Sequence, residues 1–168
     1  MSILRLLVVA LAASVLVISS RAADGEAMLR RESLGELRLG LPEKDVLKLL
    51  GKPAKQGALI LQGADGTYVQ DWHYPARGID LTMTAGEKKT GAKSVTRFTA
   101  KAPNNFGTRQ GIRIGSPENA VRKACAAHVD RDSPAAPGTF VAGSIYGGII
   151  FNFEKGKVSR IFFGAAAE

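Results

Sequence analysis

Few of the 168 residues are of a type that carries out chemistry. The chain has one cysteine, Cys125, and two histidines, His73 and His128. A thiol beside an imidazole can act as a nucleophile, but Cys125 falls on an apolar helical stripe, where cysteine usually fills a core. One cysteine cannot form a disulfide within the chain, and one cysteine with two histidines falls short of a four-ligand zinc site. The sequence therefore predicts no catalytic residues, no metal and no cofactor.

A second set of residues is suited to binding another protein, because Tyr, Trp and Arg dominate the energetics of protein interfaces. The candidate protein-binding residues are Tyr68, Trp72, Tyr74, Arg97, Tyr146 and Arg160. The first three share one face of a predicted strand. Either that face is open and binds a partner, or it packs in the core, and the alternation alone leaves both possibilities open. The next strand turns Asp80 and Thr82 away from its apolar side, so one face of the sheet must be polar.

The elements that would position these residues follow from turn signals and hydrophobic periodicity. Pro42 and Pro117 each suit the first turn of a helix, and Gly51 followed by Pro53 ends the first of these helices. Strands are predicted at residues 58–61, 67–74, 79–84, 94–100, 139–146, 149–153 and 158–163. Strands joined by short turns pair antiparallel. The expected fold class is α+β, with helices packed on one face of an antiparallel sheet.

The chain also contains an internal repeat. Gly40-Leu41-Pro42-Glu43 recurs as Gly115-Ser116-Pro117-Glu118, and later segments match in the same order. Repeats of this kind indicate duplicated structural units. We expect a first unit at residues 35–101 and a second at residues 109–164, each with one helix followed by strands. Residues 23–34, with scattered charges, are expected to form a flexible arm.

The segment from Gly40 through Glu43 and Val46 to Leu50-Gly51-Lys52-Pro53 resembles the opening motif of SmpA/OmlA-type proteins. These include the small lipoprotein of the outer-membrane β-barrel assembly machine. The doubling of the unit is similar to the fold of β-lactamase inhibitor proteins. The resemblance implies a domain without enzymatic activity that binds other proteins in or outside the cell envelope.

The first residues predict an export signal. Arg5 precedes an apolar run at residues 6–18, and Ser20-x-Ala22 has the small residues that a signal peptidase requires. We expect a signal peptide at residues 1–22, with cleavage after Ala22 and a periplasmic or secreted product. No cysteine follows the apolar run closely, so no lipid anchor is expected.

The chain is basic, with a net charge of +8. Export argues against nucleic acid and favours an acidic protein surface, or peripheral contact with anionic envelope material, as its counterpart. The sequence therefore predicts a non-enzymatic protein-binding module of the envelope, acting as an adaptor or an inhibitor. The alternative is a small-ligand carrier or an enzyme that uses the concavity of the sheet.

Overall fold

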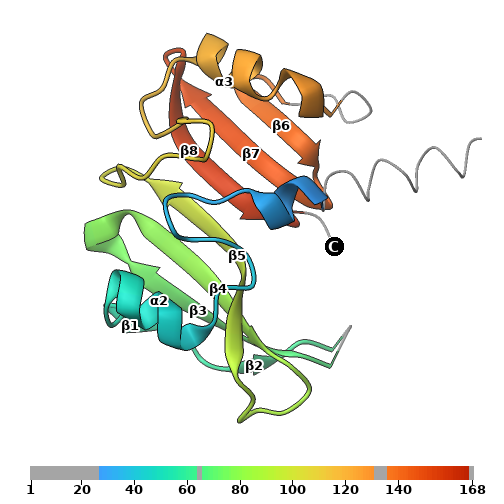
Figure 1. Cartoon of the computed structure of the whole chain (residues 1–168). Coiled ribbons are helices and arrows are strands. Elements are labelled where there is room, and N and C mark those ends of the chain that lie inside the picture. Colours follow the sequence, from blue (N-terminus) through green and yellow to red (C-terminus); the bar gives the residue numbers. More distant parts are fainter. Residues whose placement is uncertain (1–26, 64–65, 131–135, 167–168) are drawn as a thin grey trace, which may run out of the picture.

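The computed structural model describes residues 27–63, 66–130 and 136–166. Its strands form one antiparallel sheet of eight strands (Figure 1). The strands are β1 (Lys55–Gln56), β2 (Ile60–Leu61), β3 (Tyr68–Tyr74), β4 (Ile79–Ala85), β5 (Lys93–Lys101), β6 (Thr139–Ser144), β7 (Gly147–Glu154) and β8 (Lys157–Gly164). The helical elements are residues 27–31, α2 (Glu43–Leu50), α3 (Glu118–Ala124) and two 3-10 turns, η1 (Pro75–Arg77) and η2 (Ala126–His128).

The predicted α+β class, with helices as a layer on the sheet, is wrong. The described residues form mostly antiparallel sheet with three short α-helical segments, so the architecture is closer to all-β. The physical reason is helix length: α2 has 8 residues and α3 has 7. A helix of about two turns buries few side chains, and here they are Val46 and Leu50 from α2 and Val121 from α3. The strands therefore supply most of the core.

The sheet consists of two three-stranded meanders that meet along β5 and β8. The strand order is β1-β3-β4-β5-β8-β7-β6, and β2 also pairs with β3. The seam runs from Phe98 opposite Phe163 to Lys101 opposite Arg160. Both predicted units thus contribute strands to one continuous sheet, with α2 near β3 to β5 and α3 near β6 to β8 (Figure 1).

The matching glycines of the two predicted units, Gly40 and Gly115, make equivalent backbone hydrogen bonds. The N–H of Gly40 donates to the carbonyl of Val95 at 2.7 Å, and the N–H of Gly115 donates to the carbonyl of Val158 at 2.7 Å. In each case the segment that enters a helix is fastened to a central strand, β5 or β8. The entry to each short helix is therefore fixed by the sheet rather than by a side-chain cap.

One hydrophobic core extends over both meanders, on the face of the sheet that carries Trp72, Leu81, Phe98, Phe151 and Phe163. These side chains are at most 2% exposed. Because burying an aromatic or aliphatic side chain contributes about 1.5–3 kcal/mol, this face is the main source of stability. The side chains that alternate with them point to the opposite face.

The expectation of a flexible arm at residues 23–34 does not hold for its described part. Residues 27–31 are helical, and Met28, Leu29 and Leu34 are buried in the core. The backbone of Leu34 pairs with Leu37 and Thr108. In Figure 1 this blue segment crosses between the two meanders, so it closes the core where they meet.

Glycine is required where strands approach closely. At Gly148 on β7, an added Cβ would collide with the backbone of Ala142 and Ser144 on β6. Gly148 lies opposite Gly143 on one side and Gly164 on the other. Glycine at this position therefore allows β6 and β7 to approach closely.

The predicted signal peptide, residues 1–22, lies outside the described residues. Within the described ranges, none of the helices has the length and apolar character needed to cross a membrane.

Candidate functional site

The side of the sheet opposite the core carries a groove of about 590 Å³. Strand register aligns its side chains in three rows. The longest row is Lys55, His73, Asp80, Thr99, Phe162, Ile150 and Val141. The second row is Lys101, Arg160, Asn152 and Thr139, and the third is Asp71, Thr82 and Arg97. We call the residues of these rows the open face.

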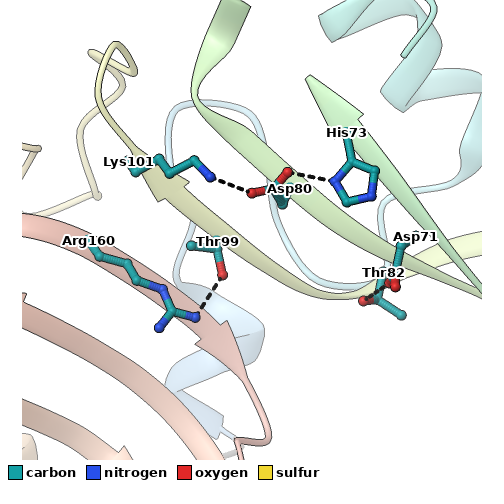
Figure 2. A network of polar contacts seen from close by, with 7 residues as sticks. All are labelled: Asp71, His73, Asp80, Thr82, Thr99, Lys101 and Arg160. Atoms are coloured by element: carbon teal, nitrogen blue, oxygen red, sulfur yellow. Dashed lines mark hydrogen bonds and ion pairs between the residues drawn. The ribbon is translucent and has the colours of Figure 1, made fainter. Parts of the chain in front are cut away.

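One half of the open face is charged. Asp80 on β4 bridges its two neighbouring strands: Oδ1 lies 2.8 Å from His73 Nδ1 on β3, and Lys101 Nζ on β5 donates to Oδ2 at 3.1 Å. Figure 2 shows the three side chains in a line across the strands. Partial burial by itself raises the pKa of the Asp80 carboxyl, but the hydrogen bonds from His73 and Lys101 outweigh burial and hold that pKa below its ordinary value. Asp80 is therefore a structural carboxylate rather than a proton donor.

Asp71, Thr82 and Arg97 form a second polar group. The Thr82 hydroxyl donates to Asp71 Oδ1 at 2.7 Å and accepts from Arg97 Nε at 3.0 Å. Thr82 is only 7% exposed. Since its proton and a lone pair are both engaged, the Thr82 hydroxyl is poorly placed to act as a nucleophile.

The other half of the open face is apolar, with one cation above it. Phe162 and Ile150 lie opposite each other on β8 and β7, and both are half-buried. The Arg160 guanidinium lies over the Phe162 ring, 5.9 Å from its centroid, and Nη2 donates to the Thr99 hydroxyl at 3.4 Å. This half can bury an apolar group beside a positive charge.

The structure brings together two of the six sequence-predicted site residues. Arg97 and Arg160 both line the groove. Trp72 and Tyr74 are 0% and 4% exposed on the core side, so they are not accessible to a partner. Tyr68 is half-buried on that same side, and Tyr146 is 69% exposed in the turn between β6 and β7, outside the groove lining.

Tyr74 has a structural task. Its hydroxyl donates to the carbonyl of Gly51 at the end of α2, at 3.0 Å. Burial raises the pKa of Tyr74 to about 12, and the nearby Arg77 offsets part of that rise. The phenol therefore stays protonated and fastens the end of α2 to β3.

Sequence reasoning missed His73, Lys101, Phe162 and Ile150 as members of the site. The alternation of β4 already placed Asp80 opposite the apolar side of its strand, whereas the alternation of β3 left the side of His73 open. These residues lie near Phe162 because β5 pairs with β8. No short turn connects these two strands, so the sequence contains no indication of their pairing. The sequence therefore indicated which strands pair within each hairpin, but not that the two meanders pair with each other.

Cys125 lies away from the open face. Its side chain is buried at the end of α3. Burial, with a smaller contribution from the Glu32 carboxylate, raises the pKa of the thiol to about 11. His73 lies on the opposite face of the sheet, so it does not pair with the Cys125 thiol. The described residues hold no group of three or more His, Cys, Asp and Glu side chains arranged for a metal ion.

We predict that Cys125 reacts slowly with a thiol reagent such as Ellman's reagent in the native protein at pH 8. Only the thiolate reacts, and at that pH the thiolate fraction of a buried thiol with a raised pKa is very small. Labelling should become fast in 6 M guanidinium chloride, which serves as the control for total thiol. Equal rates in native and denaturing buffer would contradict burial.

We predict that Asp80→Asn lowers stability at neutral pH and that the loss disappears in acid. A carboxyl whose pKa is lower in the folded than in the unfolded state stabilises the fold above its unfolded pKa of about 3.9, and this contribution is lost as the pH falls through the folded pKa. The urea midpoints of wild type and variant should therefore differ at pH 7, and the difference should shrink as the pH falls below the unfolded pKa and through the folded pKa of Asp80. Glu87→Gln, at an exposed loop position, is the control and should show no such convergence. A constant gap for Asp80→Asn would contradict the bridging role.

No protein family, no curated protein and no solved structure matches the chain. The similarity to SmpA/OmlA-type proteins therefore rests on the sequence motif alone and stays a hypothesis.

Proposed function

We propose that this chain is a non-enzymatic, exported protein-binding module that holds a partner protein on the open face of its sheet. The observation that carries the proposal is the composition of that face: an apolar strip at Phe162 and Ile150 lies in one groove with two arginines, Arg97 and Arg160. Protein interfaces combine an apolar centre with Arg and a polar rim in this way.

The charge of the open face favours an acidic partner. Its rows hold four cations, Lys55, Arg97, Lys101 and Arg160, and two carboxylates, Asp71 and Asp80, an excess of 4 − 2 = 2 positive charges. The whole chain is basic as well, at +8. Such a balance speeds association with a negatively charged surface and disfavours basic partners.

The polar groups of the face support binding rather than catalysis. Asp80 is held between His73 and Lys101, and the Thr82 hydroxyl is held between Asp71 and Arg97. Catalysis requires a nucleophile or acid–base pair free to exchange a proton with a substrate. These groups instead satisfy one another and stiffen the surface, which lowers the entropy cost of binding.

Site-specific photo-cross-linking tests the proposal. A photoreactive phenylalanine analogue replaces Phe162 on the open face, and in a matched variant it replaces Leu47, an exposed position on α2. Both variants are expressed in the source cells and illuminated. We expect a discrete cross-linked protein from position 162 and none from position 47. The same product from both positions, or a product from position 47 alone, would contradict docking on this face.

A further inference from the structure

We infer that Arg160 anchors a carboxylate of the partner, which is a protein segment that places an Asp or Glu on Arg160 and an adjacent apolar side chain on Phe162 and Ile150. This inference rests on the proposed function and specifies the chemistry that the open face selects. It follows from the geometry of Arg160, from the charge that surrounds it and from the apolar strip at its side.

Arg160 is an exposed cation held in place by two weak contacts. Its guanidinium stacks 5.9 Å from the centroid of Phe162 and donates one N–H to Thr99 at 3.4 Å. No carboxylate among the described residues lies within ion-pair distance of it. Most of its five donors are therefore available, and a guanidinium fork binds a carboxylate through two parallel hydrogen bonds.

The positive charge of a neighbouring residue strengthens the attraction of the Arg160 site for a carboxylate. Lys101 lies directly opposite Arg160 across the seam between β5 and β8. Like charges opposite each other in a sheet are destabilising, and the Asp80 carboxylate is already shared between Lys101 and His73. A carboxylate brought by a partner would compensate the remaining positive charge.

The surroundings of Arg160 fit a protein segment better than a polyanion. Asp71 and Asp80 lie on the same face, so a ligand with a dense row of phosphates would gain at Arg160 and lose at these carboxylates. Phe162 and Ile150 offer apolar surface that a phosphate or a sugar acid does not use. A side chain such as Leu or Phe next to an Asp or Glu uses both halves of the open face.

Selection of phage-displayed dodecapeptides on the purified protein tests the inference. We expect wild-type protein to enrich peptides with an Asp or Glu beside a Leu, Ile or Phe. Arg160→Gln should lose this acidic preference and bind a selected peptide about 10–30-fold more weakly. Arg113→Gln, an exposed arginine outside the open face, is the matched control and should behave as wild type.

A second variant separates failure of the anchor from failure of the proposed function. Ile150→Asp places a charge in the apolar strip and should abolish peptide binding at this face. If Ile150→Asp abolishes binding while Arg160→Gln leaves affinity and acidic preference unchanged, the carboxylate anchor is wrong and the docking face stands. If neither variant affects binding, or if the protein binds vesicles of equal parts phosphatidylcholine and phosphatidylglycerol but no peptide, both proposals are wrong.

Discussion

Replacing Trp72 by alanine is expected to lower the free energy of unfolding by about 3–5 kcal/mol. Trp72 is 0% exposed and lies on β3 between Leu81 of β4 and Gln56 of β1. Its indole N–H donates to Gln70 Oε1 at 3.0 Å, and Lys93 Nζ lies 5.5 Å from the centroid of the ring. Truncation therefore removes a large apolar volume and leaves the Gln70 amide and Lys93 without the indole. Urea unfolding followed by circular dichroism measures the loss.

Tyr146→Ala is the control for Trp72→Ala, because Tyr146 is 69% exposed in a turn. We expect it to change the unfolding free energy by less than about 0.5 kcal/mol. Trp72→Phe should recover part of the stability that alanine loses. If Trp72→Ala stays as stable as wild type and instead loses partner binding, Trp72 belongs to a binding surface and the assignment to the core is wrong.

The position of Trp72 shows what the alternation of a strand can predict and what it cannot. Alternation correctly placed Trp72 and Tyr74 on the same face of one strand. It could not say whether that face was the core, because the neighbouring residues Val69 and His73 are also partly apolar. The register resolves this point, since Trp72 lies opposite Leu81 whereas His73 lies opposite Asp80.

The elements were predictable where the sequence carries turn signals or strong alternation, and poorly predictable elsewhere. The seven predicted strands correspond to β2 to β8. The missing strand, β1, is the polar pair Lys55–Gln56, which has no alternation to detect. The scattered charges of residues 27–34 are typical of an exposed arm, whereas Met28, Leu29 and Leu34 among them pack in the core. The predicted fold class was wrong because α2 and α3, of 8 and 7 residues, are too short to form a layer on the sheet.

The candidate site was the least predictable feature, since it depends on a long-range pairing. Arg97 and Arg160 were proposed because arginine is frequent at protein interfaces, and the structure places both in the lining of one groove. Their companions Phe162 and Thr99 meet only because β5 pairs with β8. Contacts between residues so distant in the sequence are set by the global packing of the two meanders and leave no local signal.

Phe163→Ala is expected to cost about 3–5 kcal/mol of unfolding free energy and to weaken both meanders at once. The Phe163 ring stacks on Phe98 with centroids 4.5 Å apart and planes at 15°, and both side chains are at most 1% exposed. This stack lies on the seam, where β5 and β8 pair over only four residue pairs. Amide hydrogen exchange should therefore accelerate in β3 and β4 as well as in β6 and β7. Acceleration confined to one meander would contradict a single cooperative core.

Phe162→Ala provides the matched control, because it removes the same side chain from the same strand on the opposite face. Phe162 is half-buried on the open face and lies opposite Thr99 and Ile150. We expect a stability loss of about 1 kcal/mol or less, since no core cavity forms, and a large loss of affinity for the partner, since Arg160 loses the ring that supports it. Two adjacent phenylalanines would then report separately on fold and function. If instead Phe162→Ala unfolds the protein as Phe163→Ala does, or leaves partner affinity unchanged in a folded protein, the open face is not the docking surface.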